Sequence, residues 1–231
     1  MPVYSASRQY MFFANPQTAS KAVSQALITH LDGAPFPRKT RKAVAEGKVL
    51  ERNYHGTYDD IVEAGLMTVE DLEKLFKFCA VRNPFDLMVS RYLKRQRTIV
   101  DDNKDTGMAW ARGRSNVLTS MEKAKDLPFA EWLQAELGSI AERGKTVKAP
   151  FKYLDHADHV MRFEALQEGF DEVLKRLGVT EPIEVAPRNV TGERVSEGGK
   201  KHFTEYYDDT SRRLIEKVYA PLLERFGYSF G

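Results

Sequence analysis

The sequence has a single cysteine, no long hydrophobic segment and almost no net charge. Because Cys79 is alone, an internal disulfide and a cysteine-based metal cluster are excluded, and its apolar surroundings FKFCAV are typical of a buried, inert thiol. No window approaches the ~20 apolar residues that a membrane span requires, and the N-terminus MPVYSASRQYMFF lacks a basic segment followed by a long apolar one. We therefore expect a cytoplasmic protein without a membrane span.

Charge of one sign is also lacking, since 35 Lys and Arg residues face 33 Asp and Glu residues, for a net charge of +2. This balance argues against a general nucleic-acid-binding protein, so a site for an anion must be built locally from a few basic residues. His156 and His159, in DHADH, are three residues apart and could share an ion. A solvated turn or helix is the commoner arrangement, and we predict no metal site.

The 231 residues, 42% of them hydrophobic, suffice for one large core, and we predict a single domain over residues 1–231. Apolar segments that favour strands alternate with helical patterns, which is typical of a parallel sheet covered by helices on both faces. The predicted strands are 10–14, 75–84 and 156–166, with a short one in 48–56; the predicted helices are 18–31, 57–65, one from Thr68, 85–97, 128–140, 167–179 and 208–226, kinked at Pro221. Residues 33–47 and 187–203 are predicted to be loops, and residues 99–127 an irregular, exposed insertion.

Ligands of such a sheet bind beyond the carboxyl ends of its strands, where the first candidate loop is NPQTASKA, residues 15–22. A helix N-terminus there would present backbone N–H groups and a partial positive charge to a phosphate or sulfate. Thr18 and Ser20 could add hydroxyl donors, but Gln17 occupies the place where such loops usually carry a lysine. A plain N-capped helix start is an equally good interpretation of this loop.

The second candidate loop, VRNPFDLMVS, is more specific. Arg82 ends a predicted strand, and Ser90 lies about two turns into the following helix. An arginine that forks onto a phosphate, together with a hydroxyl donor, forms a phosphate clamp. The structural alternative is that Arg82 pairs with Asp86 to hold the helix start.

Together these two stretches resemble the sulfotransferases that use 3′-phosphoadenosine 5′-phosphosulfate, and within them the carbohydrate-type enzymes and their bacterial relatives. That family shows Pro-Lys-Thr-Gly/Ala-x-x-Ser for the 5′-phosphosulfate and Val-Arg-Asn-Pro-aromatic-Asp-x-x-x-Ser for the 3′-phosphate. The resemblance continues in YHGTYDDI, VMRFEALQEGFDEVLKRLGV and EYYDDTSRRLIEKVYAPLLERFGYSF, and so covers most of the chain apart from residues 99–127. It implies a three-layer α/β fold, a parallel sheet flanked by helices as in the P-loop nucleotide kinases. A kinase itself is disfavoured, because Gly-x-x-x-x-Gly-Lys-Ser/Thr is absent from the sequence.

The resemblance implies transfer of a sulfuryl group from 3′-phosphoadenosine 5′-phosphosulfate to a hydroxyl of a carbohydrate or glycan-like acceptor, without a metal. His55 matches the family's histidine and is the candidate base, although it could instead cap the helix at Thr57. The resemblance also predicts the residues that bind the donor, which are Gln17, Thr18, Ala19, Ser20, Lys21, Arg82, Ser90, Arg188, Lys200 and Lys201.

The main question about activity is whether the protein transfers the sulfuryl group with Gln17 in place of the family's lysine. In the family, the lysine at this place contacts the phosphosulfate and assists the leaving oxygen, whereas Gln17 donates a hydrogen bond without a charge. Lys21, four positions on, could swing its ammonium to the same anion, and we predict that His55, Lys21 and Gln17 are the catalytic residues. If Lys21 does not reach, the protein would be a weakened, nucleotide-binding relative of sulfotransferases that acts in binding or interaction.

Overall fold

The computed structural model describes residues 1–37, 43–45, 48–50, 56–100, 115–185, 195–196 and 199–231. The chain divides into two compact units, and each is made from two stretches of sequence. The first unit comprises Met1–Arg82 and Lys148–Asn189, and the second comprises Asn83–Val147 and Val190–Gly231. The first unit contains the main sheet, and the second consists mostly of helices.

In the described residues, the first unit is built on a five-stranded sheet with the strand order β3-β1-β2-β6-β7. Its strands are β1 (Val3–Ser5), β2 (Tyr10–Phe13), β3 (Ala34–Pro35), β6 (Phe76–Val81) and β7 (His159–Arg162). Strands β2, β6 and β7 are parallel and set Phe12 opposite Phe78, whereas β1 is antiparallel to both of its neighbours. The predicted α/β fold is confirmed, and the sheet is mixed because β1 and β3 add an antiparallel edge.

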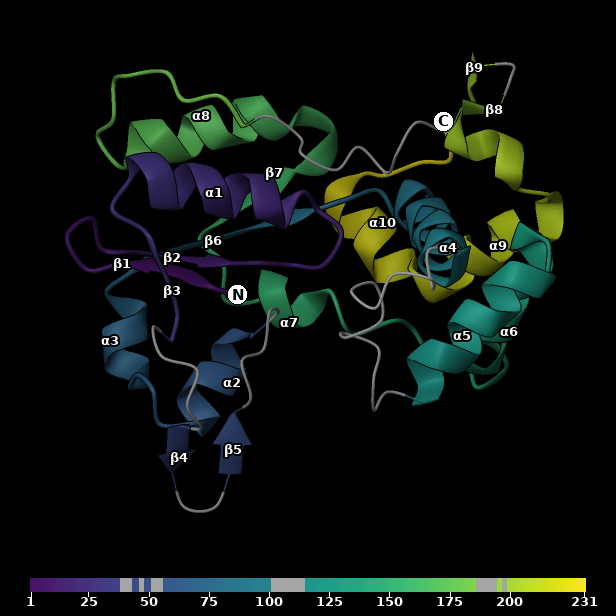
Figure 1. Ribbon diagram of the computed structural model, residues 1–231, viewed down its shortest axis with the longest axis horizontal. Helices are drawn as coiled ribbons and strands as arrows, with labels where there is room; N and C mark the ends of the chain where they lie inside the picture. The colour runs from purple at the N-terminus through teal and green to yellow at the C-terminus, as the bar shows by residue number, and fades with distance from the viewer. Residues whose placement is uncertain (38–42, 46–47, 51–55, 101–114, 186–194, 197–198) are drawn as a thin grey trace. The chain divides into compact units, whose positions relative to one another are not determined.

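Helices cover both faces of this sheet (Figure 1). Helices α1 (Ser20–His30) and α8 (Leu166–Arg176) lie on one face, and α2 (Tyr58–Glu63), α3 (Val69–Glu73) and α7 (Phe151–Leu154) lie on the other. A short 3-10 turn, η1 (Phe163–Ala165), joins β7 to α8. Between the sheet and the helices α1 and α8, Phe12 and Phe78 of the strands pack with Val23, Leu27 and Phe170 of the helices. Each of these five side chains is no more than 1% exposed. Each such side chain contributes about 1.5–3 kcal/mol through burial, which fixes α1 and α8 on the strands.

The helix boundaries follow the capping signals in the sequence. Thr68 accepts a hydrogen bond from the Asp71 amide at 3.1 Å, which confirms the predicted start of α3. Thr57 forms a capping box with Asp60 at the start of α2. Gly178 has a φ of 69° just beyond the end of α8, as the predicted helix stop requires.

The segment before α2 contains a hairpin of β4 (Ala43–Ala45) and β5 (Lys48–Leu50). Strand β5 confirms the short strand predicted in residues 48–56. Strands β3 and β4 both lie in residues 33–47, the stretch predicted to be a loop, and the prediction was wrong at both. The pattern that favoured a loop was the Pro, Gly and basic residues of this stretch, and the three residues of β4 contain none of them.

The second unit is a group of helices that pack around Trp132, which is fully buried. Its helices are α4 (Pro84–Val100), α5 (Ser115–Asp126), α6 (Phe129–Glu142), α9 (Asp209–Val218) and α10 (Ala220–Phe226), with a 3-10 turn, η2 (Phe203–Tyr206), before α9. The indole of Trp132 donates to the Ser120 carbonyl at 3.2 Å, and the Tyr92 hydroxyl donates to the Leu127 carbonyl at 2.8 Å. These bonds hold α4, α5 and α6 together.

Three stretches of the second unit differ from the sequence predictions. Residues 115–126, predicted to be irregular, form α5, because Met121 and Ala124 lie three positions apart and supply a buried stripe within a polar composition. The predicted loop 187–203 contains a hairpin of β8 (Val195–Ser196) and β9 (Gly199–Lys200). The last predicted helix is two helices that meet at Tyr219, because Pro221 is favoured in the first turn of a helix and disfavoured in its interior.

Candidate functional site

The first candidate loop leaves the carboxyl end of β2 and is fixed to the neighbouring strand. Asn15, 7% exposed, donates from its amide to the Ala80 carbonyl of β6 at 2.9 Å. Thr18, 2% exposed, donates from its hydroxyl to the Asn15 carbonyl at 2.9 Å. The Thr18 hydroxyl therefore stabilises the loop internally, and the bond from Asn15 to β6 fixes the start of α1 relative to the sheet.

The backbone of this loop adopts an unusual conformation. Gln17 and Ala19 have φ values of 63° and 59°, in the left-handed region that non-glycine residues rarely enter. Such strained residues gather at ligand sites, where left-handed residues turn successive N–H groups toward one concave surface that binds anions. Ala19 is the N-cap of α1, and in the described loop no side chain caps this helix and no acidic residue lies in its first turn. The amides of the first turn are thus suited to an external anion.

The second candidate loop meets the first through Arg82. This side chain, 7% exposed, donates from Nη1 to the Gln17 carbonyl at 3.1 Å. Its guanidinium carbon lies 4.0 Å from the ring centroid of Phe163, which follows β7. Residues that follow three neighbouring parallel strands therefore converge at one edge of the sheet, where ligands of α/β proteins bind.

The other predicted site residues lie in the first turn of α1, in the second unit or outside the described residues. Ser90 is 3% exposed and lies on α4, in the second unit, which also contains Asp86. Lys21 is exposed in the first turn of α1, and Lys201 lies in the second unit with its ammonium 4.7 Å from the Tyr206 ring centroid. The remaining predicted positions, His55, Arg188 and the side chain of Lys200, lie outside the described residues.

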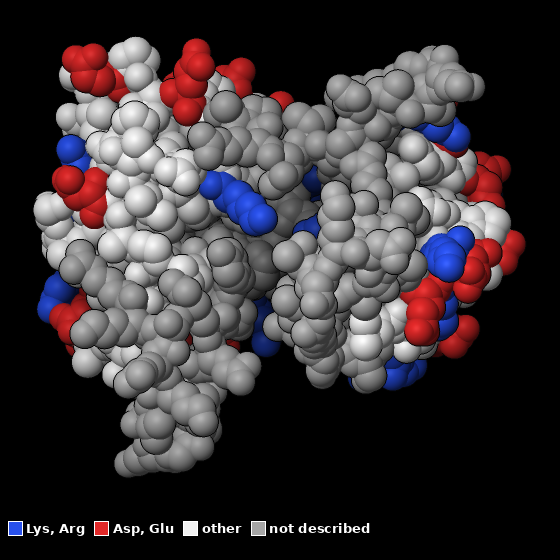
Figure 2. All heavy atoms as spheres, viewed as in Figure 1, with Lys and Arg blue, Asp and Glu red and all other residues white. Residues whose placement is uncertain are grey.

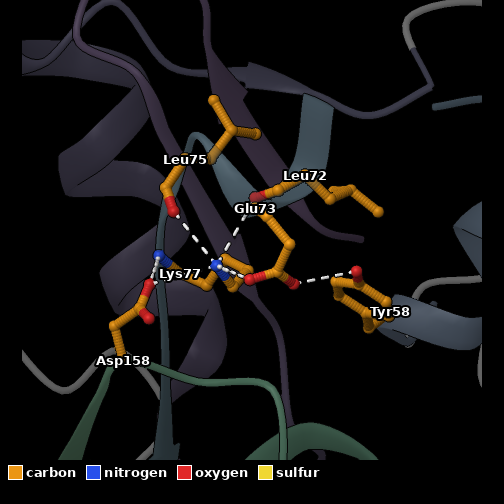
Figure 3. A network of polar contacts seen from close by, with 6 residues as sticks. All are labelled: Tyr58, Leu72, Glu73, Leu75, Lys77 and Asp158. Atoms are coloured by element: carbon orange, nitrogen blue, oxygen red, sulfur yellow. Dashed lines mark hydrogen bonds and ion pairs between the residues drawn. The ribbon is translucent and has the colours of Figure 1, made fainter. Parts of the chain in front are cut away.

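The segment just after His55 is firmly anchored (Figure 3). Tyr58, the first residue of α2, donates from its hydroxyl to Glu73 at 2.9 Å, and burial together with this bond raises the pKa of Tyr58 to about 12. The ammonium of Lys77 in β6 lies 3.4 Å from carboxylate oxygens of both Glu73 and Asp158. The same ammonium donates to the Leu72 and Leu75 carbonyls. This network, with the buried Lys77 at its centre, ties the start of α2 to α3 and β6.

The two histidines that were considered as metal ligands make other contacts. The His156 ring stacks on Tyr58 with centroids 4.0 Å apart, and its Nε2 lies 3.7 Å from Asp59. His159 Nε2 lies 3.3 Å from the Gly169 carbonyl. Across the described ranges, no group of three or more His, Cys, Asp or Glu side chains is placed to hold a metal ion.

The face drawn in Figure 2 has no broad basic surface among its described residues. On the face drawn in Figure 2, the described residues include both Lys and Arg and Asp and Glu side chains, and neither sign forms one continuous patch. The balanced composition agrees with this view. With a net charge of only +2, an anion site on this protein must be built from a few local groups.

Asn15 and Phe163 are the two residues at this site that sequence reasoning did not select. The signals were present, because Asn15 stands before a proline at a strand end and Phe163 directly follows the last residue of β7. Their roles depend on partners 65 and 81 positions away in the chain, Ala80 and Arg82, which no local pattern identifies.

Comparison with known families decides the assignment. The sequence model of the sulfotransferase family matches residues 7–229, nearly the whole chain. The chain belongs to the sulfotransferase family. Curated proteins and solved structures gave no match. Family membership supports sulfuryl transfer in general, and the fold agrees with it. In the described part of this sulfotransferase, no helix has the length and apolar character of a membrane span.

Proposed function

We propose that this sulfotransferase moves a sulfuryl group from 3′-phosphoadenosine 5′-phosphosulfate to an acceptor hydroxyl. The observation that carries the proposal is the hydrogen bond from Arg82 to the Gln17 carbonyl, because it joins the two motifs that in the family bind the two ends of this nucleotide. The left-handed residues Gln17 and Ala19 add a backbone surface suited to the 5′-phosphosulfate. Family membership supports the same donor.

The proposed reaction is an in-line displacement at sulfur. The acceptor oxygen forms a bond to sulfur, the bond between sulfur and the bridging 5′-phosphate oxygen breaks, and the acceptor proton passes to a base. The products are a sulfate ester and adenosine 3′,5′-bisphosphate. By analogy with phosphoryl transfer, the protein contributes positioning and stabilisation of the developing anion. We assign the base to His55. Lys21 and Gln17 stabilise the leaving oxygen. The nucleotide donor is bound by the two loops together with Ser90, Arg188, Lys200 and Lys201.

We further propose a carbohydrate or glycan-like acceptor. This rests on the resemblance of the motifs RNPFDLMVS and YHGTYDDI to carbohydrate-type sulfotransferases. No metal has a role in this proposal, because arginine, lysine and backbone donors neutralise the nucleotide. The cytoplasm is the proposed compartment.

The decisive experiment is a transfer assay with donor labelled in the sulfuryl group. Purified protein is incubated with a panel of glycans, monosaccharides and small hydroxyl compounds, and sulfated products are identified by mass spectrometry. The proposal predicts a sulfate ester and an equimolar amount of adenosine 3′,5′-bisphosphate. Release of bisphosphate at the rate of the protein-free control with every acceptor would contradict transferase activity on these acceptors.

The second candidate is a nucleotide-binding relative with weakened catalysis. The observation that favours it is Gln17, whose side chain carries no charge where the family has a lysine, while Lys21 is exposed. Loss of one charge-assisted donor at a developing anion lowers turnover on the order of 10²-fold. Tight binding of the bisphosphate without measurable transfer would select this candidate.

A further inference from the structure

The start of α4 is tied to residues near the end of the described chain. Asn83 is the residue before α4, and its Oδ1 accepts a hydrogen bond from the Phe85 amide at 3.1 Å. Its carbonyl accepts from the Leu87 amide at 2.8 Å. The side-chain Nδ2 of Asn83 donates to the Ser229 carbonyl at 3.0 Å. One side chain thus caps the helix and also bonds to the segment after α10.

Aromatic rings complete this attachment. Phe85, 1% exposed, is met edge-on by Phe230 at 5.1 Å and by Tyr207 at 5.6 Å between ring centroids. Tyr207 and Phe230 also contact each other edge-on at 5.4 Å. Three rings in mutual edge-to-face contact restrain one another, because each such geometry is favoured by the ring quadrupoles. We call Phe85, Tyr207 and Phe230 the aromatic clasp.

A polar contact within the clasp fixes the backbone of the first turn of α4. The Tyr207 hydroxyl donates to the Phe85 carbonyl at 2.9 Å. Burial raises the pKa of Tyr207, so its hydroxyl keeps the proton that it donates. The guanidinium of Arg212 lies over the Phe230 ring, 5.3 Å from its centroid. The first turn of α4 is consequently held by contacts from residues 207, 229 and 230.

We propose that Ser229 and Phe230 are positioning residues for the nucleotide site, which they serve by holding the first turn of α4. Asn83 directly follows Arg82 in the chain, and α4 carries Ser90, so the motif predicted to bind the 3′-phosphate includes the held turn. Two side chains such as Arg82 and Ser90 bind the same phosphate tightly only when the peptide segment between them is held in one conformation. The inference rests on the proposed function, because it concerns the same nucleotide.

The test compares Phe230→Ala with Phe226→Ala, a matched control. Phe226 is a half-buried phenylalanine at the end of α10, and its ring contacts Tyr228 and the guanidinium of Arg225. Isothermal titration gives the affinities for adenosine 3′,5′-bisphosphate and for AMP, which lacks the 3′-phosphate. We expect Phe230→Ala to weaken the bisphosphate about 10-fold, a common size for coupling between separate sites. The affinity of Phe230→Ala for AMP should stay within about twofold of that of the unchanged protein. The affinity of Phe226→Ala for the bisphosphate should also stay within about twofold.

A second measurement separates positioning from general loss of stability. Hydrogen exchange at the Phe85 and Leu87 amides reports the two hydrogen bonds that Asn83 accepts, and it should become faster in Phe230→Ala than in Phe226→Ala. Phe230→Tyr retains the ring and should restore bisphosphate affinity. If Phe230→Ala does not fold, Phe230→Leu, which keeps most of the apolar volume without the ring, takes its place with the same expectations.

The outcomes are distinct. An equal loss for AMP and the bisphosphate, an equal effect of the two alanine variants, or unchanged exchange at Phe85 and Leu87 would overturn the positioning role while leaving the proposed function intact. If the unchanged protein binds neither nucleotide, the proposed function is overturned and this inference fails with it. A selective loss of bisphosphate affinity together with faster exchange supports the role of the clasp.

Discussion

The two loops at the carboxyl ends of β2 and β6 represent different ways to bind an anion. The loop 15–22 presents mainly backbone N–H groups to an anion. The side chain of Gln17 is uncharged, the Thr18 hydroxyl is bonded to the Asn15 carbonyl, and the left-handed residues Gln17 and Ala19 shape the backbone. The loop that begins with Arg82 offers a side-chain cation, held by the Gln17 carbonyl and by the ring of Phe163. The comparison teaches that the buried cation lies on one loop and the strained backbone geometry on the other.

This division has an energetic consequence. An arginine that is desolvated and already oriented loses little freedom when it binds a phosphate, and its removal leaves the partner charge unpaired. Substitutions other than to proline leave the backbone N–H groups in place, so the first loop is sensitive mainly to changes in its conformation or in the charges beside it. Substitutions in the second loop should therefore affect binding most, and substitutions in the first loop should affect turnover and stability.

The largest effect is expected at a residue outside both loops. If the loops do the binding, His55→Ala should lower turnover by about 10² to 10⁴, the usual contribution of a positioned general base, and leave nucleotide affinity nearly intact. Steady-state kinetics and titration calorimetry on the same preparation measure the two quantities. A cooperative loss of folding with no separate effect on turnover would instead assign His55 to the helix start at Thr57.

Arg82→Ala tests the charged loop. Adenosine 3′,5′-bisphosphate should bind about 2 to 5 kcal/mol more weakly, the scale for truncating one partner of a desolvated charge pair, while AMP binding changes much less. Arg82→Lys should recover only part of the affinity, because an ammonium lacks the planar fork of a guanidinium. Titration calorimetry gives both affinities, and thermal melting controls for folding. Equal losses for both nucleotides would return Arg82 to a structural role.

Lys21→Ala and Gln17→Lys test the loop 15–22, where Gln17 stands in place of the family's lysine. If Lys21 supplies the missing cation, Lys21→Ala should lower the transfer rate by on the order of 10²-fold with little change in bisphosphate affinity, because the contact matters most as charge develops on the leaving phosphate. Gln17→Lys should then bring no gain. The opposite pair of results, a strong gain from Gln17→Lys and no effect of Lys21→Ala, would show that the loop is weakened and that Lys21 is not involved.

The smallest effect concerns the backbone itself. Ala19 has φ 59° and ψ 20°, and a glycine avoids the steric penalty of about 1–2 kcal/mol that an alanine side chain suffers there. Ala19→Gly should raise the free energy of unfolding by about 1 kcal/mol in urea denaturation. Ala22→Gly, three positions on and inside α1, should lower it by about 0.5–1 kcal/mol. Two losses of similar size would mean that Ala19 is not held in the left-handed region.

Much of the α/β layout could be predicted from local sequence signals. The apolar segments of β2 and β6, the N-cap at Thr68 and the glycine stop after α8 each depend on neighbouring residues, and each prediction was confirmed. The edge strands β1 and β3 were missed, because three and two residues are too few to show alternation. Helix α5 was missed because its buried positions are sparse within a polar stretch.

The candidate site was predicted only in part. Arg82 and the loop 15–22 were selected from their motifs, and the bond between Arg82 and Gln17 shows that the two lie together. The left-handed conformation of Gln17 and Ala19 gave no signal, since neither residue is a glycine and the surrounding contacts impose the geometry. The stack on Phe163 joins segments that are distant in sequence, so only the folded chain reveals it.

The most direct test of the account is the nucleotide preference of the unchanged protein. Ligands that bind only the folded state raise the melting temperature, and the rise grows with the logarithm of the ligand concentration divided by Kd. If Arg82 and the loop 15–22 form one site for a nucleotide with phosphates at both ends, adenosine 3′,5′-bisphosphate will raise the melting temperature clearly, and AMP and ATP at the same concentration will raise it much less. Equal shifts from all three nucleotides, or no shift from the bisphosphate, would contradict that claim.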